Sequence, residues 1–187
     1  MAHEISSRRA RPALALALGL AFSAPATGAR TPGEVEIGQT LREATIQGLN
    51  GPARRLSEFR GKPLIINVWA SWCGPCKAEM ASLERLSWHD DAKHFRVIGI
   101  STDDYPEKAK AYLVSSNATI SHYIDQKLLM EHMLGASQIP LTVLVDRDGK
   151  VIEKVYGATQ WDGPQALALI RKSFGLKGNA AAGGRGR

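Results

Sequence analysis

The stretch that decides the fold runs from residue 67 to residue 80 and reads NVWASWCGPCKAEM. It contains Cys73 and Cys76, which are the only two cysteines among the 187 residues. A structural disulfide between residues so close in sequence would close a very small loop and would stabilise the fold little. The spacing therefore indicates a pair of thiols used for redox chemistry rather than for holding distant segments together.

The residues that follow Cys73 predict a helix that gives the two thiols different surroundings. Cys76, Met80 and Leu83 are spaced i, i+4 and i+7, so Cys76 shares the stripe that faces the core. Cys73 lies at the start of the helix, where unpaired backbone N–H groups and the helix dipole lower the pKa of a thiol. We therefore expect Cys73 to be the exposed thiolate that attacks a substrate. We expect Cys76 to be the half-buried thiol that resolves the mixed disulfide.

The residues next to the cysteines fit this interpretation. Gly74 and Pro75 separate the two thiols, and a proline in the first turn of a helix loses no hydrogen bond and presets the helical φ angle. The dipeptide therefore holds the sulfur atoms close enough to bridge. Trp72 precedes the helix, and we expect it to form an apolar rim on which a substrate rests.

A metal site explains the two cysteines less well. Structural zinc needs four ligands, typically from a second pair of cysteines or from two histidines at close spacing. The chain has no further cysteine, and we expect His122 and His132 to be surface or loop residues. The sequence therefore predicts no metal and no cofactor, because the two thiols can carry the electrons themselves.

The length and the 44% of hydrophobic residues suit one domain with a proper core. LIINVW at residues 64–69 is a near-continuous apolar run, as expected of a strand covered on both faces. The predicted elements, in chain order, are a hairpin at 43–56 with its turn at 49–51, a strand at 64–69, a helix at 73–86, a strand at 96–100, a helix at 106–114, a strand at 120–124, a short helix at 127–134, a hairpin at 141–157 and a closing helix at 163–174. Strands alternating with helices predict an α/β fold with a central mixed β-sheet flanked by helices.

The two ends of the chain differ from the middle. SSRRARP at residues 6–12 is cationic, an apolar run follows at 13–22, and small residues then precede Thr27. This pattern predicts a signal peptide at 1–26. The apolar run is much shorter than the about 20 residues that span a membrane, so we expect a soluble protein in a bacterial periplasm after cleavage, or a membrane-tethered one without it. The Gly/Ala-rich basic tail at 176–187 is expected to be disordered.

The net charge of +6 does not indicate a nucleic-acid-binding surface. The middle of the chain is nearly balanced and shows no basic stripe with interleaved aromatic residues. The excess of positive charge lies near the ends, at Arg8, Arg9, Arg11, Lys177, Arg185 and Arg187.

Several motifs together resemble a known family. WCGPC is similar to the active-site motif of the thioredoxin superfamily. LSEFRGKP, STDD after a strand, IPLTVLVDRDGKV and YGATQWDGPQAL resemble its TlpA/ResA branch, which comprises exported thiol–disulfide oxidoreductases. The resemblance covers roughly residues 38–174. It implies a thioredoxin-like fold over a domain at 38–175, with the N-terminal β-hairpin as an extension.

The resemblance also implies roles for individual residues. It makes Cys73 the nucleophile and Cys76 the resolving thiol. Pro140 matches the cis-proline that faces the disulfide in this fold, with Ile139 before it. Backbone groups of this dipeptide would then lie beside the sulfur atoms, where an incoming substrate strand can pair with them. Trp72, Gly74 and Pro75 would complete the substrate-binding surface.

A proton acceptor has to be found elsewhere than in thioredoxins. They carry a buried aspartate six residues before the first cysteine, and this position is Asn67 here. An amide cannot take up a proton at physiological pH. Similar reductases carry a glutamate three residues after the second cysteine, which corresponds to Glu79. Burial would raise the pKa of Glu79 and let it shuttle a proton; the alternative is a solvated helix residue beside Lys77.

The leading hypothesis is therefore a periplasmic, monomeric thiol–disulfide oxidoreductase of the protein-disulfide reductase type. Its clients would be the haem-binding cysteines of apocytochromes c, during cytochrome c biogenesis, or cysteines of a copper-delivery protein. A membrane thiol–disulfide electron carrier would re-reduce it, because the periplasm is kept oxidising. The Gly-Pro dipeptide resembles that of thioredoxin, which favours a reductant over an oxidant.

Two other functions remain open from the sequence. A Cu(I)-binding chaperone would hold the metal through Cys73 and Cys76, since soft thiolates suit copper, with His122 as a weak candidate for a third ligand. A peroxidase of the peroxiredoxin type would need its attacking cysteine in a different local setting, with a threonine one turn earlier.

Overall fold

The computed structural model describes residues 31–177. The predicted signal peptide at 1–26 and all but the first two residues of the predicted tail at 176–187 lie outside the described residues. Between residues 31 and 177, no helix is both long enough and apolar enough to span a membrane.

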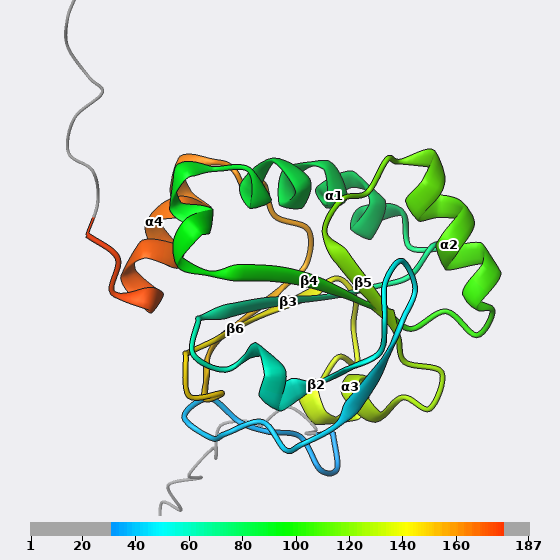
Figure 1. The fold of residues 1–187 in the computed structure, drawn as a ribbon, viewed down its shortest axis with the longest axis horizontal. Coiled ribbons are helices and arrows are strands. Elements are labelled where there is room, and N and C mark those ends of the chain that lie inside the picture. The colour runs from blue at the N-terminus through cyan, green and yellow to red at the C-terminus, as the bar shows by residue number, and fades with distance from the viewer. Residues whose placement is uncertain (1–30, 178–187) are drawn as a thin grey trace, which may run out of the picture.

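The fold is a single mixed sheet of seven strands with helices on both faces (Figure 1). The strand order is β2-β1-β5-β4-β3-β6-β7, with β3, β4 and β5 parallel and the neighbours β1 and β6 antiparallel to them. The strands are β1 Thr45–Gly48, β2 Arg54–Arg55, β3 Leu64–Trp69, β4 Arg96–Ser101, β5 Ser121–Ile124, β6 Leu141–Val145 and β7 Val151–Tyr156. The helices are α1 Gly74–Ser87, α2 Pro106–Ser115, α3 Leu129–Leu134 and α4 Pro164–Phe174, with short 3-10 helices η1 Leu56–Phe59 and η2 Asp90–His94.

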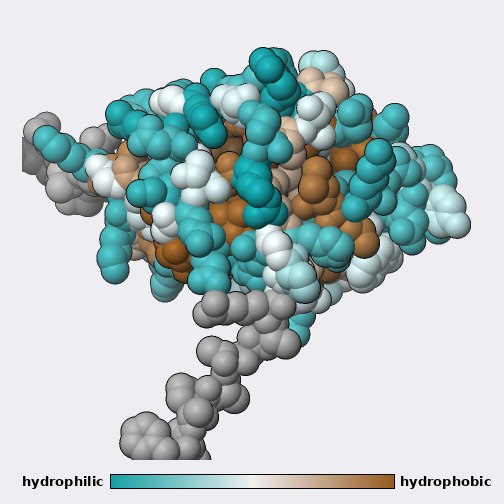
Figure 2. All heavy atoms as spheres, turned by 90° about the horizontal axis from the view of Figure 1, so that it is seen from below, coloured by the Kyte–Doolittle hydropathy of each residue, from teal (hydrophilic) through white to brown (hydrophobic). Residues whose placement is uncertain are grey.

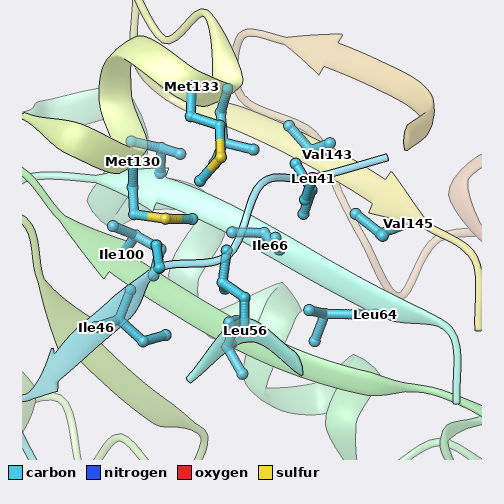
Figure 3. Close-up of a cluster of buried hydrophobic side chains, with 14 of the residues drawn as sticks. Leu41, Ile46, Leu56, Leu64, Ile66, Ile100, Met130, Met133, Val143 and Val145 are labelled. Carbon is cyan, nitrogen blue, oxygen red and sulfur yellow. The ribbon is translucent and has the colours of Figure 1, made fainter. Parts of the chain in front are cut away.

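The central strand β3 explains why the sheet is covered on both sides. All six of its residues are buried, as the apolar run predicts. Its alternate side chains point to opposite faces: Ile65 packs with Leu83 and Leu86 of α1 and with Ile170 of α4. On the opposite face of the sheet, Leu64, Ile66 and Val68 of β3 belong to a second apolar cluster. This cluster also contains Met130 and Met133 of α3 (Figure 3).

The second face has a thin cover. α3 and η1 are short, with six and four residues. Seen from below, apolar side chains are visible near the centre of the surface between hydrophilic ones (Figure 2). On the opposite face, α1 and α4 are longer helices and cover more of the sheet. This is the face that carries the cysteines.

The hairpins follow the turn residues of the sequence. β6 and β7 pair antiparallel around the turn that contains Gly149, whose φ of 86° is in the left-handed region that favours glycine. At the other end of the chain, β1 and β2 pair antiparallel at two positions only, and β1 also pairs with β5. The strand predicted at 120–124 begins one residue later, at Ser121, and the backbone N–H of Ile120 donates to the Glu84 carboxylate (3.3 Å).

The sequence prediction for His122 is wrong. We expected a surface or loop residue, but His122 lies in β5 with 1% of its surface exposed. Its ring packs edge-on against Trp69, with 5.4 Å between the ring centroids, and a Cβ atom at Gly99 would come within 2.1 Å of its Nδ1 atom. Within the described part of the chain, neither ring nitrogen has a hydrogen-bond partner. Burial therefore favours the neutral ring and lowers the pKa of His122 to about 4.

We predict that His122 makes the protein less stable as the pH falls. An unfolded histidine titrates near 6.5 and the folded one near 4, so between these values the unfolded state binds more protons and stability is lost on acidification. From pH 7 to pH 5 the loss amounts to about 2 kcal/mol. Urea unfolding at both pH values should show that His122→Leu removes this part of the pH dependence, whereas the exposed His94→Gln keeps it. Equal pH dependence in wild type and His122→Leu would contradict the prediction.

Candidate active site

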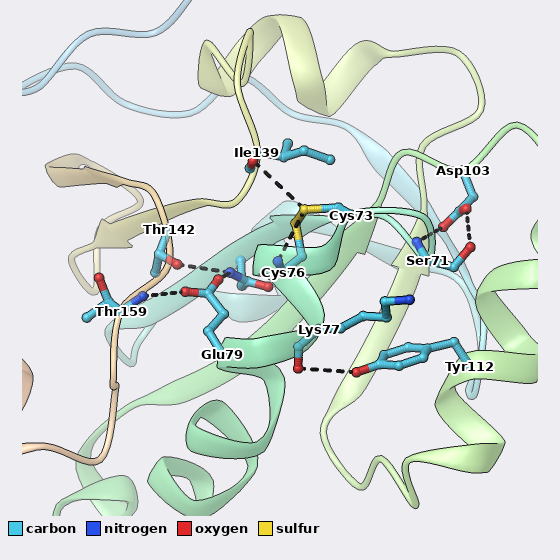
Figure 4. Close-up of a disulfide and its surroundings, with 11 residues drawn as sticks. Ser71, Cys73, Cys76, Lys77, Glu79, Asp103, Tyr112, Ile139, Thr142 and Thr159 are labelled. Atoms are coloured by element: carbon cyan, nitrogen blue, oxygen red, sulfur yellow. Dashed lines mark hydrogen bonds between the residues drawn. A yellow bond between two sulfur atoms is a disulfide. The ribbon is translucent and has the colours of Figure 1, made fainter.

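Cys73 and Cys76 form a disulfide at the start of α1, directly after the loop that follows β3 (Figure 4). Cys73 is the N-cap residue of the helix, and its Sγ atom accepts a hydrogen bond from the backbone N–H of Cys76 (3.2 Å). Pro75 lies in the first turn of α1, as predicted. The thiol of Cys73, when it forms, is therefore placed where backbone N–H groups stabilise an anion.

Both cysteines are more buried than the sequence suggested. Cys73 was expected to be exposed and Cys76 half-buried, but their exposed fractions are 5% and 0%. They belong to a cluster with Trp69, Met80 and other apolar residues, which covers the disulfide from the core side. The expected order is kept, because Cys73 alone of the two has any surface in contact with solvent.

The surroundings of Cys73 combine exposed residues with one backbone segment. Trp72 is 69% exposed, and Gly74 and Pro75 are also exposed. The Ile139-Pro140 peptide bond is cis, and the carbonyl oxygen of Ile139 lies 3.9 Å from Cys73 Sγ (Figure 4). The carbonyl oxygen of Pro140 already accepts from the backbone N–H of Gly157 (2.9 Å). The structure thus brings all five residues that were predicted to bind substrate to the same disulfide.

Glu79 is buried, so the alternative of a solvated helix residue is wrong. Its exposed fraction is 3%. Its Oε1 atom accepts from Asn67 Nδ2 (2.7 Å), and its Oε2 atom accepts from the backbone N–H of Thr159 (2.9 Å) and from Trp161 Nε1 (3.2 Å). Burial raises the pKa of Glu79, and the three hydrogen bonds oppose this rise in part. None of the ion pairs found among residues 31–177 includes Glu79.

Asn67 links Glu79 to the sheet. Its Nδ2 atom also donates to Thr142 Oγ1 (3.0 Å), and Asn67 of β3 and Thr142 of β6 lie directly opposite each other in the antiparallel pair. Thr142, Thr159 and Trp161 were not singled out from the sequence. Thr159 and Trp161 lie within YGATQWDGPQAL, but no local pattern reveals a contact with a residue about eighty positions earlier.

A second buried carboxylate fixes the loop in front of the cysteines. Asp103 is 1% exposed and accepts from the backbone N–H of Ser71 (2.8 Å), the Ser71 hydroxyl (2.6 Å) and the Ser101 hydroxyl (2.7 Å). These bonds tie the end of β4 to the loop that presents Trp72 and Cys73. STDD was recognised as a motif in the sequence, but this role of its first aspartate was not.

The described residues 31–177 contain no group of three or more His, Cys, Asp and Glu side chains that could hold a metal ion. His122, considered above as a third copper ligand, lies on β5 with its ring against Trp69. The described residues therefore give the Cu(I)-chaperone hypothesis no third metal ligand beside Cys73 and Cys76.

Comparisons with known proteins agree with this geometry. The family model described as Redoxin matches residues 36–170. The thiol-disulfide oxidoreductase ResA of Bacillus thuringiensis subsp. konkukian is 27% identical over 124 residues, which are 66% of this chain and 72% of that protein. The thiol:disulfide interchange protein DsbE of Vibrio cholerae is 30% identical over 120 residues, which are 63% of each chain.

Two solved structures show the same fold. The thioredoxin domain of a thiol-disulfide oxidoreductase from Bacteroides vulgatus superposes with a TM-score of 0.62 at 21% identity, covering 74% of this chain and 98% of that one. A DsbF homologue from Corynebacterium diphtheriae gives a TM-score of 0.62 at 22% identity, covering 73% and 87%. The thioredoxin-like architecture predicted from WCGPC is confirmed.

We predict that Asp103 stabilises the loop before the cysteines. Asp103→Ala leaves the hydroxyls of Ser71 and Ser101 without their acceptor, and we expect a loss of about 2 kcal/mol in the free energy of unfolding. The matched control is Asp104→Ala, which changes an exposed neighbour and should stay within about 0.5 kcal/mol. Urea unfolding of the oxidised proteins measures both, and equal values for the two variants would refute this role of Asp103.

Proposed function

The chain belongs to the Redoxin family and is a thiol–disulfide oxidoreductase, and from that premise we propose that it reduces disulfides of client proteins outside the cytoplasm. The observation that carries the proposal is the Cys73–Cys76 disulfide at the start of α1, with only Cys73 accessible and a buried carboxylate one turn after Cys76.

In the proposed reaction the protein starts with both thiols reduced. The Cys73 thiolate attacks one sulfur of the client disulfide, a mixed disulfide forms, and the other client sulfur leaves as a thiolate that takes up a proton. Cys76 then attacks Cys73 Sγ, the bond between Cys73 and the client breaks, and the second client thiol is released. The client gains two electrons and two protons, and the Cys73–Cys76 disulfide forms. Since Cys76 is fully buried, Cys73 is the only sulfur that a client can reach.

We propose that Glu79 takes the proton of Cys76 before the second attack. A thiol has to lose its proton to become a nucleophile, and Cys76 is shielded from water. Glu79 follows Cys76 by three residues on α1, so both side chains lie on the same face of the helix (Figure 4). The raised pKa of Glu79 suits a group that binds and releases a proton.

The proposed client-binding surface consists of Trp72, Gly74, Pro75 and the dipeptide Ile139-Pro140. The carbonyl oxygen of Ile139 faces Cys73 Sγ, whereas that of Pro140 is occupied by Gly157. An extended client segment would pair with the backbone at Ile139 and bring its cysteine to Cys73. The exposed ring of Trp72 would cover the apolar part of that segment.

The nature of the client and the location come from the relatives and the sequence. The ResA relative is named a thiol-disulfide oxidoreductase and the DsbE relative a thiol:disulfide interchange protein. The TlpA/ResA branch that the sequence resembles is related to reductases that serve cytochrome c maturation. We propose an apocytochrome c or a copper-delivery protein as client, a membrane thiol–disulfide electron carrier as reductant, and the periplasm as the site of action. The signal-peptide pattern at 1–26 supports export.

The reduction potential of Cys73–Cys76 tests the direction of electron flow. Equilibration of the full-length mature protein against glutathione and dithiothreitol buffers should give a value near that of thioredoxin, about −270 mV, or lower. Such a value suits an electron donor. A value near that of DsbA, about −120 mV, would overturn the proposal and make the protein an oxidant.

Two substitutions test the roles within the reaction. Cys76→Ser should accumulate the mixed disulfide with an oxidised client peptide, because the resolving thiol is absent, and mass spectrometry would detect the adduct on Cys73.

Glu79→Gln should slow release of the reduced client by about 100-fold, without a matching change in the first attack. Glu107→Gln, on the exposed first turn of α2, is the control. Release at the wild-type rate in Glu79→Gln would exclude Glu79 as the proton acceptor.

A further inference from the structure

The loop between β7 and α4 encloses the Glu79 carboxylate on the side away from the cysteines. Its residues 159–161 supply two of the three hydrogen bonds to Glu79, from the Thr159 backbone and from the Trp161 indole. Figure 4 shows Thr159 and Cys76 on opposite sides of the carboxylate. Trp161 is fully buried and packs in the cluster between α1, α4 and the sheet. The loop is therefore part of the surroundings of the proton acceptor.

Helix α1 itself holds this loop in place. The Ser82 hydroxyl accepts from the backbone N–H of Trp161 (3.0 Å) and donates to the carbonyl oxygen of Glu79 (2.7 Å). Arg85 forms an ion pair with Asp162. Because Glu79, Ser82 and Arg85 follow one another at intervals of three, one side of α1 contacts the loop along two turns. The Trp161 ring is thus fixed relative to the helix that carries the disulfide.

The hydrogen bonds distinguish the two oxygens of Glu79. Oε2 receives both N–H donors from the loop, one from Thr159 and one from Trp161. Among the donors of residues 31–177, Oε1 receives only Asn67 Nδ2. A carboxylate oxygen offers about two lone pairs, so Oε2 is fully occupied and Oε1 keeps one position free. An indole N–H is a donor only, so Trp161 can neither accept the proton of Glu79 nor turn into an acceptor.

We propose that Trp161 is a positioning residue that occupies Glu79 Oε2, together with the Thr159 backbone, and leaves Oε1 as the oxygen that exchanges a proton with Cys76. The inference rests on the proposed function, in which Glu79 is the proton acceptor. The groups bonded to the carboxylate are Asn67 of β3, with Thr142 of β6 behind it, and the two loop donors, and Cys76 precedes Glu79 by three residues on α1. Asn67, Thr142 and the loop donors are all neutral groups that carry no charge at any working pH, so none of them offsets the loss of the indole donor.

The first test is the pH dependence of client release in Trp161→Phe. Phenylalanine keeps a buried aromatic ring but removes the N–H, and a carboxylate that loses a donor becomes harder to ionise. The acid limb of the release rate should move to higher pH by about one unit, which is roughly a tenfold slower release on that limb, with recovery at alkaline pH. Trp88→Phe, which changes a 76% exposed ring, should reproduce the wild-type profile. A profile that coincides with wild type, or an equal loss of rate at every pH, would overturn the inference.

The second test needs no change at Trp161. In the full-length mature protein labelled with ¹⁵N, the indole N–H resonance of Trp161 should shift with pH as Glu79 ionises, and Glu79→Gln should abolish this titration. Absence of the titration in the wild type would overturn the role of Trp161 even where Trp161→Phe fails to fold. Suppose that Glu79→Gln releases client at the wild-type rate, while the indole resonance still titrates in the wild-type protein. The role of Glu79 as proton acceptor then fails, but the Trp161–Glu79 hydrogen bond stands.

Discussion

The rest of the site depends on the hydrogen bonds between the buried Glu79 carboxylate and its neutral partners. Moving a charged group out of water is very unfavourable unless hydrogen bonds replace the lost hydration, and Glu79 receives three of them. The donors come from β3 and from the loop after β7, so the buried carboxylate receives all three hydrogen bonds only when the sheet, α1 and that loop are assembled. The surroundings of Glu79, the proposed proton acceptor, are thus a product of the whole fold.

The sheet contributes to this site through one polar pair. LIINVW of β3 and LTVLV of β6, two neighbouring strands inside the sheet, are otherwise apolar and contain one polar residue each, Asn67 and Thr142. The antiparallel register places these two residues opposite each other, where their side chains bond. A shift of one residue in this register would turn Thr142 to the other face and leave Asn67 with Glu79 alone. Burial of polar groups therefore helps to select the pairing of β3 with β6 as well as to build the site.

Local sequence patterns predicted most of the fold and the redox-active pair of cysteines. Apolar runs located β3 and β4, turn residues located the β6–β7 hairpin, and WCGPC located the start of α1. Burial of individual polar residues was predicted less well, because it depends on what packs over them. His122 was placed on the surface, but Trp69 covers its ring. The donors from Thr159 and Trp161 reach Glu79 across about eighty residues, and a spacing of that length carries no periodic signal in one sequence.

The position of the acid also has a geometric consequence. The aspartate that thioredoxins carry six residues before the first cysteine corresponds to Asn67 of β3 here, and the acid of this chain lies on α1 instead. The distance between an acid on a strand and a thiol on a helix depends on how the two elements pack. Glu79 and Cys76 belong to the same helix, at a spacing of three residues, so their separation along the axis is set at about 4.5 Å by helix geometry alone. Asn67 then needs only to donate to the carboxylate, which an amide does in either protonation state of Glu79. An acid on α1 in place of β3 therefore makes the proposed proton acceptor part of the element that carries the thiol.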